Sequence, residues 1–366
     1  MEDNRHAQGH AGDVVPLRGE ASTEGVSPDA WAREAAAPRP VLFAIGDIHG
    51  NYDALQSILQ TLQSRHQIFT DSGMESLADH VTLVFTGDYV DRGPDAIKAL
   101  DYLARMKSSS EGRLVMLMGN HEAMALAALG AIRTMAGIDL DQSSRVLAAW
   151  RHHAGNGGKA LYIEIFRMLS RQESPDDVAI AKAFLEEFGR GGRAGNLLRS
   201  LDILHFHEIS GKTFLFSHGD VPRDSRTSEN LRNRRTLERL RQKFKAHVAG
   251  ESDTRDWVTK YDTDLPGREL LWGRNYTGVD GSESDFAGMN SREEAVRARE
   301  ICDACGVDYI VAGHTPTPDG QIRAYGDRIF HVDVGMIRGG EPTALMVSDA
   351  GIASVTQHGD RMLVSF

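Results

Sequence analysis

Five short motifs in this 366-residue chain carry side chains that can bind divalent metal ions. Each motif places a glycine beside an Asp, a His or an Asn. Carboxylate, imidazole and amide oxygen together suit hard or borderline ions such as Mn²⁺, Fe or Zn²⁺. Buried charges at five such points are costly unless an ion neutralises them, so the motifs predict a metal centre. They occupy residues 46–51, 87–93, 119–122, 217–220 and 313–316.

The spacing within these motifs indicates what the metal centre would do. Asp47 and His49 are two residues apart, so their side chains point to the same side of an extended segment. Asp88 stands in the middle of the set and could bridge two ions. Two ions roughly 3.5–4 Å apart polarise a phosphoryl oxygen and generate a hydroxide in line with the leaving group. The indicated chemistry is hydrolysis of a phosphoester.

An apolar segment of buried-strand type precedes each motif, and helical periodicity separates several of these segments. On one predicted helix Leu55, Ile58, Leu59 and Leu62 share a face, and Asn51 can cap its start. This alternation predicts an α/β sandwich. Because strand ends line the ligand crevice of open α/β sheets, the motifs should meet there. The predicted strands are residues 41–45, 81–85, 114–118, 213–216 and 309–312, with a sixth around 330–334.

The chain divides into three parts by composition. Residues 1–38 are rich in Gly, Ala, Pro and charge without periodicity, which predicts a flexible N-terminal tail. We expect residues 39–366 to form the domain that carries the five motifs. Within that domain, residues of about 123–210 are dominated by Ala, Leu, Arg and Glu at helical spacing. We expect a mainly helical insertion that caps one side of the site.

Charge and composition exclude several classes of protein. The net charge of −11 argues against broad binding to nucleic acid, although a local site can still take a phosphorylated substrate. Two cysteines give no disulfide framework and suit a reducing cytosol. The sequence contains no run of 18 apolar residues, so we expect no membrane-spanning helix. The N-terminus shows no apolar signal region. We therefore expect a cytoplasmic protein without a membrane partner.

The five motifs, in this order, resemble those of the calcineurin-like metallophosphoesterase superfamily. The G-D-Y-V-D-R-G and G-N-H-E motifs at 87–93 and 119–122 are similar in particular to its phosphoprotein phosphatase (PPP-type Ser/Thr phosphatase) branch. The resemblance covers residues of about 41–335 and implies a four-layer αββα sandwich carrying the helical insertion. It also implies two divalent metal ions as cofactors, with Mn²⁺ expected first and Fe or Zn²⁺ as alternatives.

The resemblance assigns the metal-capable residues to two ion sites that share Asp88. One ion would be held by Asp47, His49 and Asp88. The other would be held by Asp88, Asn120, His218 and His314.

The same resemblance gives roles to residues beside the metal ions. His121 would be the general acid that protonates the leaving alkoxide, with Asp91 orienting it. A carboxylate partner raises the pKa of an imidazole, which suits that role. Arg92 would bind the substrate phosphate with its planar fork. Arg274 is the candidate for the second phosphate-binding arginine of the branch; the alternative is a surface arginine beside a core tryptophan.

Two departures from the eukaryotic pattern favour a bacterial-like member. Asp220 stands where eukaryotic members carry a second glycine, and the insertion is much longer than their corresponding segment. Trp150 and the following G-N-G-G at 155–158 resemble an element of bacterial members. Asn156 could reach the site from that element, although a glycine-rich turn without a catalytic part is the simpler interpretation.

The sequence therefore predicts a metal-dependent phosphomonoester hydrolase that uses a metal-bridging hydroxide. We expect phosphorylated proteins or small phosphoesters as substrates, first phosphoserine and phosphothreonine, with phosphotyrosine as a further option. A symmetrical dinucleoside tetraphosphate hydrolase shares the motifs and is the alternative enzyme. A non-catalytic scaffold of the same fold is disfavoured because the predicted ligands are complete. The sequence does not fix the physiological substrate or the oligomeric state.

Overall fold

The computed structural model describes residues 38–135, 153–170, 177–223, 230–249, 267–277 and 284–366. The predicted N-terminal tail, apart from Pro38, and Trp150 lie outside the described residues. The strands form two sheets. The first has six strands in the order β11-β10-β9-β1-β2-β3. Its members are β1 Val41–Ile45, β2 Val81–Phe85, β3 Leu114–Met116, β9 Ala344–Ser348, β10 Gly351–Thr356 and β11 Gly359–Ser365.

The second sheet has five strands in the order β4-β5-β6-β8-β7. In the first sheet β1, β2 and β3 are parallel, whereas β9, β10 and β11 pair antiparallel. In the second sheet β5, β6 and β8 are parallel, and the edge strands β4 and β7 pair antiparallel. Parallel strands need cover on both faces, which accounts for their continuous apolar sequences. The members are β4 Leu204–Ile209, β5 Lys212–Ser217, β6 Tyr309–Ala312, β7 Arg323–Tyr325 and β8 Ile329–His331.

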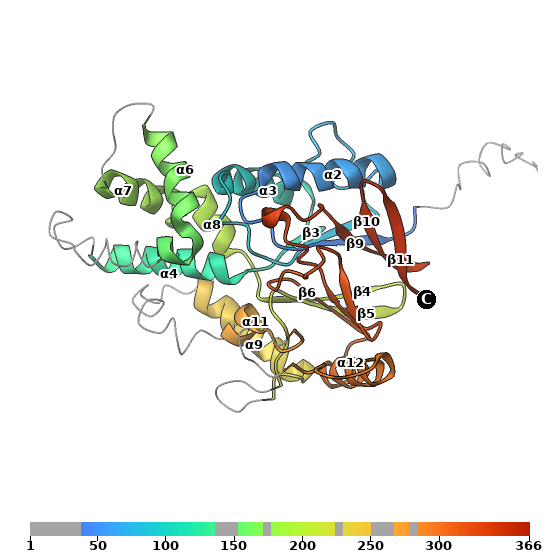
Figure 1. Ribbon diagram of the computed structural model, residues 1–366. Coiled ribbons are helices and arrows are strands. Elements are labelled where there is room, and N and C mark those ends of the chain that lie inside the picture. The colour runs from blue at the N-terminus through green and yellow to red at the C-terminus, as the bar shows by residue number, and fades with distance from the viewer. Residues whose placement is uncertain (1–37, 136–152, 171–176, 224–229, 250–266, 278–283) are drawn as a thin grey trace, which may run out of the picture. The chain divides into compact units, whose positions relative to one another are not determined.

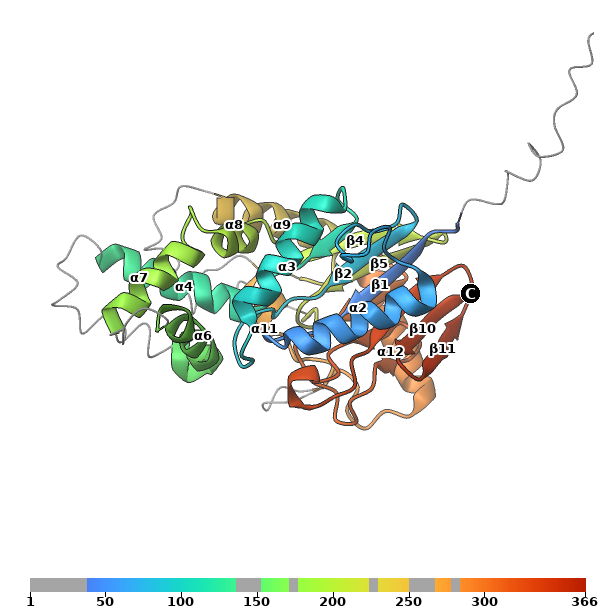
Figure 2. The ribbon, with the colours of Figure 1, turned by 90° about the horizontal axis from the view of Figure 1, so that it is seen from above.

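Helices cover the outer face of each sheet, and the four-layer αββα prediction is confirmed (Figure 1). Seen from above, helices α2 (Tyr52–His66) and α3 (Ala96–Ser109) lie over the strands of the six-stranded sheet (Figure 2). Among the described helices, none combines the length and the apolar composition that crossing a bilayer requires. The covering helices are α2 Tyr52–His66 and α3 Ala96–Ser109 on one side, and α9 Arg234–Ala249, α11 Arg268–Trp272 and α12 Ser291–Cys305 on the other; a 3-10 turn spans Met336–Arg338.

The first helix shows how local sequence sets an element. Asn51 caps α2 by accepting a hydrogen bond from the Ala54 N–H at 3.1 Å, as predicted. The four predicted apolar residues of α2, from Leu55 to Leu62, are buried. The helix ends at His66, and the residue that caps it, Gln67, has a left-handed backbone and donates its N–H to the Gln63 carbonyl.

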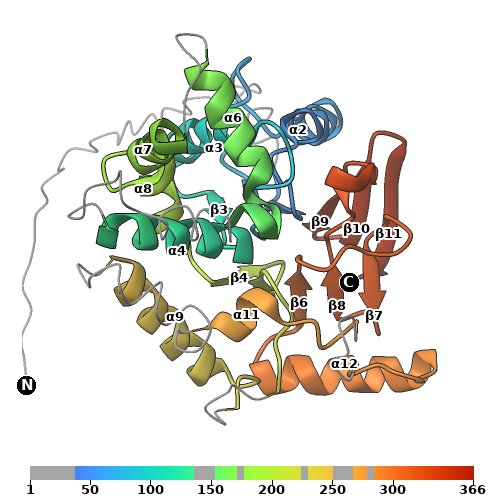
Figure 3. The same cartoon turned by 60° about the vertical axis from the view of Figure 1, so that its left-hand side comes forward.

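The insertion forms a helical cluster at one end of the sandwich (Figure 3). Glu164 joins it to α3 by accepting the N–H groups of Ile97 and Lys98, and Arg193 forms a 3.1 Å ion pair with Asp101. Its elements are α4 Asn120–Met135, a π-helical turn Ala154–Gly158, α6 Lys159–Leu169, α7 Asp177–Phe188 and α8 Arg193–Arg199.

One boundary of the insertion differs from the prediction. The helical part ends at Arg199 rather than near residue 210, because Leu204–Ile209 forms β4. This segment pairs antiparallel with β5 through the tight connection at Ser210 and Gly211. Pairing with a neighbouring strand, which local periodicity does not reveal, decides its structure.

Candidate active site

The predicted ligands meet where strand ends from both sheets converge. Asp47, Asp88 and Asn120 follow β1, β2 and β3 of the six-stranded sheet, whereas His218 and His314 follow β5 and β6 of the five-stranded sheet. Each of these side chains is at least 94% buried. The centre therefore lies between the two sheets, as expected for ligands carried on strand ends.

One cluster brings together His49, Asp88 and His121, whose candidate ligand atoms lie within 4.8 Å of one another. The Nε2 atom of His49 is 3.5 Å from Asp88 Oδ2 and 3.8 Å from Asp47 Oδ2. Its Nδ1 lies 3.1 Å from the Val90 carbonyl oxygen and donates to it, which leaves Nε2 with a lone pair toward the carboxylates. Burial lowers the pKa of His49 to about 3, so the ring is in the neutral, metal-binding form.

A second cluster brings together Asp88, His218 and His314. The Nε2 atom of His218 is 3.3 Å from Asp88 Oδ1 and 3.1 Å from Asn120 Oδ1, and Nδ1 donates to the Thr86 carbonyl at 2.9 Å. Burial opposes protonation of His218, but the neighbouring carboxylates outweigh it and raise its pKa to about 9. Without an ion a proton occupies Nε2, and metal binding would release it.

The donor set fits two divalent ions. Asp88 belongs to both clusters, with Oδ2 toward His49 and Oδ1 toward His218. Three buried atoms, Asp47 Oδ2, His49 Nε2 and His314 Nε2, have no hydrogen-bond partner among the described residues. Buried polar atoms without partners are rare in proteins unless they have another function. Ions bound in the two clusters would satisfy all three.

His121 differs from the other histidines because both its ring nitrogens already face polar groups. Nδ1 is 2.8 Å from Asp91 Oδ2, and Nε2 is 3.0 Å from Arg92 Nη2. Burial opposes its protonation, but the carboxylates of Asp88 and Asp91 outweigh it and raise the pKa of His121. The contact with Asp91 suits the predicted acid. A guanidinium only donates, so Nε2 accepts from Arg92 in this arrangement and would carry a proton only after Arg92 turns to a substrate phosphate. His121 also lies within reach of the first cluster.

The two predicted phosphate-binding arginines flank the same centre. Arg92 has an exposed side chain that reaches His121. Arg274 lies in the loop that follows α11 and is half-buried. Burial, together with the charges of His218 and Arg274, lowers the pKa of His314, which indicates that this guanidinium lies close to His314. Arg92 therefore lies against the predicted acid, and the charge of Arg274 acts on the candidate ligand His314.

Several site residues adopt left-handed backbone conformations that non-glycine residues rarely take. The φ angles are 50° at His49, 54° at Asp88, 68° at Asp91, 66° at Arg92 and 66° at His314. Such conformations persist only where the surrounding structure holds them, and they cluster at functional sites. They turn the chain sharply after each strand and so aim the side chains at one point.

Glu122 is a site residue whose function the sequence did not reveal. Its fully buried carboxylate accepts N–H groups from Gly119 and Asp88 on one oxygen, and from Tyr89 and Val90 on the other, at 2.8–3.1 Å. The glycine is required, since a Cβ at Gly119 would lie 2.1 Å from Asp88 Oδ1. Glu122 thus ties together two loops that carry candidate ligands.

Asp220, the departure from the eukaryotic pattern, is a buried structural clamp. Its carboxylate accepts the Tyr276 N–H at 2.6 Å and the His331 Nε2–H at 2.7 Å. Its backbone N–H donates to the Gly273 carbonyl at 3.0 Å. Asp220 therefore fixes the segment that carries Arg274.

The insertion also contacts the predicted acid. His153, which the sequence analysis did not single out, has Nε2 3.1 Å from Asp91 Oδ2. Gly157 accepts the Arg92 N–H at 3.0 Å. The side chain of Asn156 is outside the described part of the structure, so its predicted reach stays a prediction.

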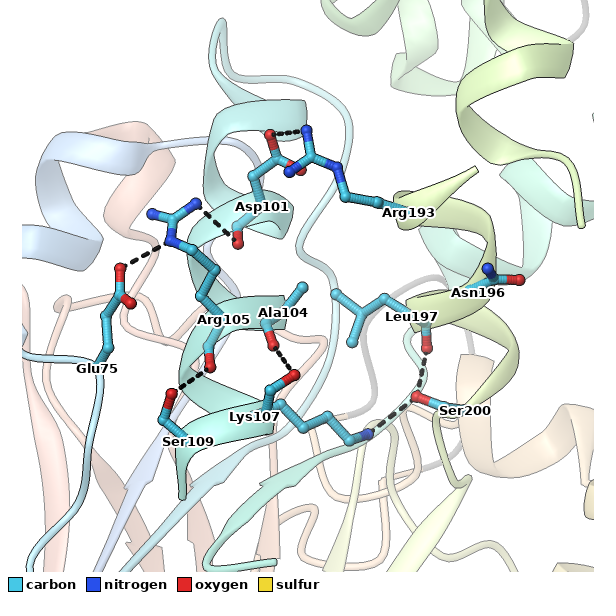
Figure 4. A pocket seen from close by; sticks show the side chains of 11 residues that line it. Glu75, Asp101, Ala104, Arg105, Lys107, Ser109, Arg193, Asn196, Leu197 and Ser200 are labelled. Atoms are coloured by element: carbon cyan, nitrogen blue, oxygen red, sulfur yellow. Dashed lines mark hydrogen bonds and ion pairs between the residues drawn. The ribbon is translucent and has the colours of Figure 1, made fainter. Parts of the chain in front are cut away.

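A surface groove of about 680 Å³ lies between α3 and α8, away from these residues (Figure 4). Its cations already have partners: Arg105 pairs with Glu75, and Arg193 pairs with Asp101. None of the predicted site residues lines it.

Comparison with known proteins identifies the family. Shewanella-like protein phosphatase 1 of Plasmodium berghei is 25% identical over 307 residues, covering 81% of this chain and 67% of that protein. A symmetrical bis(5'-nucleosyl)-tetraphosphatase of Methylobacillus flagellatus is 38% identical over 85 residues, covering 23% of this chain and 25% of that protein. The structure of a cold-active protein-tyrosine phosphatase from a psychrophilic Shewanella species matches with a TM-score of 0.57 and 18% identity, covering 88% of this chain and 80% of that one.

The similarity to Shewanella-like protein phosphatase 1 agrees with the predicted resemblance to a PPP-type, bacterial-like member. The family model described as calcineurin-like phosphoesterase matches residues 41–318, which is most of the chain. The chain belongs to the calcineurin-like phosphoesterase family.

Proposed function

We propose that the chain is a phosphomonoesterase that uses two divalent metal ions, most readily Mn²⁺. The observation that carries this proposal is Asp88, whose two carboxylate oxygens face two separate clusters of ligand-capable atoms. Bound ions would polarise a phosphoryl oxygen and lower the pKa of a water molecule. One ion would be held by Asp47, His49 and Asp88, and the other by Asp88, Asn120, His218 and His314.

The remaining residues of the site would act on the substrate. Arg92 and Arg274 would bind phosphoryl oxygens, since a guanidinium presents parallel N–H donors. His121 would donate the Nε2 proton to the leaving alkoxide, while Asp91 holds Nδ1 in place. The raised pKa of His121 supports this role, because the acid must carry its proton near neutral pH.

The substrate class follows from the relatives rather than from the metal ligands. Similarity along most of the chain to a protein phosphatase supports phosphorylated Ser, Thr or Tyr in proteins. The short match to a symmetrical bis(5'-nucleosyl)-tetraphosphatase supports the dinucleotide hydrolase as the alternative. Hydrolysis rates of phosphoserine, phosphothreonine and phosphotyrosine peptides and of diadenosine tetraphosphate, each with Mn²⁺, decide between them. A preference for the dinucleotide over every phosphopeptide would replace our first choice.

Two variants test the chemistry. Asp88→Asn should lose bound metal and turnover together, as measured by elemental analysis and p-nitrophenyl phosphate hydrolysis. His121→Gln should keep the metal stoichiometry but lower kcat on phenyl phosphate by about 10²–10⁴-fold, the usual contribution of a general acid. Full activity of His121→Gln, or two tightly bound ions in Asp88→Asn, would refute the assignment.

A further inference from the structure

We propose that His153 is a positioning residue: it holds the Asp91 carboxylate and, through Asp91, fixes the imidazole of His121. The inference rests on the proposed function of His121 as general acid. His153 comes from the segment before α6, whereas Asp91 follows β2 and His121 lies in the first turn of α4, shortly after β3. The insertion would thus complete the catalytic machinery.

The contact geometry carries the proposal. Asp91 Oδ2 accepts hydrogen bonds from His121 Nδ1 at 2.8 Å and from His153 Nε2 at 3.1 Å. All three side chains are buried, with at most 2% of their surface exposed. Asp91 Oδ1 has no hydrogen-bond partner within the described segments, so the two imidazoles orient the carboxylate. Without His153, the only imidazole bonded to Asp91 Oδ2 in the part of the chain that the structure describes would be that of His121, which is the ring that Asp91 must hold in place.

The backbone of the same loop also depends on the insertion. Asp91 and Arg92 both have left-handed φ angles, which neighbouring structure must hold in place. The Arg92 N–H donates to the Gly157 carbonyl at 3.0 Å. Gly157 belongs to the π-helical turn that directly follows His153, and such turns are frequent at functional sites. One short segment therefore supports the loop through a side chain and through a carbonyl.

The glycines of this segment allow that approach. A Cβ at Gly158 would lie 2.5 Å from the His153 ring, and one at Gly157 would lie 3.0 Å from Cε1 of His121. The Phe184 ring of α7 also lies near His153, with the ring centroids 6.1 Å apart. The His153 imidazole thus has Gly158 and α7 as close neighbours. The absence of side chains at Gly157 and Gly158 therefore lets this segment lie directly against His121 and His153.

A purely structural role for His153 would be to dock the insertion, and the structure offers a matched control for that role. Arg193 also joins the insertion to the body of the domain, through its ion pair with Asp101 of α3. Arg193→Ala weakens docking alone. His153→Ala weakens docking and removes the hydrogen bond to Asp91.

The test uses the Mn²⁺-loaded 366-residue chain and two substrates with different leaving groups. Phenyl phosphate needs a proton on its departing oxygen far more than p-nitrophenyl phosphate does. His153→Ala should lower kcat on phenyl phosphate by about 10- to 100-fold with little change in KM, since small misplacements of a catalytic group have effects of this order. The loss on p-nitrophenyl phosphate should be smaller, and Arg193→Ala should leave both rates unchanged.

Conservative variants keep the test decisive if the alanine variant does not fold. A glutamine at 153 can place its side-chain N–H near the position of Nε2, whereas an asparagine is too short. His153→Gln should therefore retain most of the phenyl phosphate rate, and His153→Asn should not. Urea unfolding and metal content of each variant establish that the fold and the ions are intact. Equal rates for the two variants would overturn the proposal.

A double-mutant cycle separates this inference from the proposed function. If His153 acts through His121, then His153→Ala should cause no further loss in the His121→Gln background. A full additional loss there, or an equal loss on both substrates, would overturn the role of His153 alone. Full activity of His121→Gln would instead refute the general acid. Imidazole NMR signals of the metal-free chain give an independent readout, because His153→Ala should shift those of His121.

Discussion

Replacing Glu122 with glutamine tests whether its carboxylate holds the two ligand-bearing loops. Each oxygen accepts two backbone N–H groups, Gly119 and Asp88 on one side and Tyr89 and Val90 on the other. Glutamine keeps the size of the side chain but turns one oxygen into a donating NH₂ group. Whichever way the amide is oriented, two buried N–H groups lose their acceptor and face another donor.

The loss of stability in Glu122→Gln can be worked out from the two N–H groups that lose their acceptor. A buried donor without a partner costs about 1–3 kcal/mol, so two donors predict a loss of about 2–6 kcal/mol in the free energy of unfolding. Native domains are stable by only about 5–15 kcal/mol, so this loss is easily measured. Because the Asp88 backbone is one of the released groups, Mn²⁺ affinity should also fall, by about 10–100-fold.

The assay pairs this variant with a control at a similar carboxylate. Glu164 is also buried and also accepts backbone N–H groups, but at the start of α3 rather than beside the candidate ligands. Urea unfolding of the metal-free chain and calorimetric titration with Mn²⁺ are measured for Glu122→Gln and Glu164→Gln at one pH. Only Glu122→Gln should weaken Mn²⁺ binding. Unfolding within about 1 kcal/mol of the unaltered chain, together with unchanged Mn²⁺ affinity, would refute the reasoning.

Three further predictions concern stability. Burial raises the pKa of Glu164 from 4.5 to about 7, so its contribution to stability is fully present below pH 4.5 and is lost as the pH rises through 7. The free energy of unfolding should therefore be higher at pH 5 than at pH 8, by up to about 3 kcal/mol. Glu164→Gln should remove this difference, as measured by urea unfolding at the two pH values. Asp220→Ala leaves the Tyr276 N–H and His331 without their acceptor and should lower the unfolding free energy by about 2–6 kcal/mol, whereas Asp349→Ala at the exposed surface should have little effect. Chelation should lower the melting temperature, and added Mn²⁺ should raise it again with the logarithm of its concentration; a melting temperature indifferent to both would contradict metal binding.

The sequence predicted the central strands well because their apolar runs are continuous. The predicted residues 41–45, 81–85 and 309–312 coincide with the observed bounds of β1, β2 and β6. β4 was missed because Leu204–Ile209 contains two histidines and a glutamate, and only its pairing with β5 makes it a strand. Local composition therefore predicts strands buried on both faces better than strands at a sheet edge.

The candidate site was predictable only in part. Strand-end motifs correctly indicated that the predicted ligands lie together, since parallel strands bring their ends to one edge. The partners that hold them left no local pattern. His153 meets Asp91 across 62 residues of chain, and His331 meets Asp220 across 111. A single histidine in a helical or strand segment does not reveal a partner so far away.

The candidate metal ligands come from the first strand of the folded chain, β1, and from residues as late as His314, so they are synthesised at different times. The His314 N–H donates to Asp47 Oδ1 across 267 residues, and β1 lies between β2 and β9. Chains leave the ribosome from the N-terminus, so Asp47, His49 and Asp88 emerge long before His314. The nascent chain then exposes an incomplete carboxylate and imidazole set. If the proposed centre binds metal, stable loading would require the His314 segment to be in place, and the ion acquired would depend on the metals available at that point.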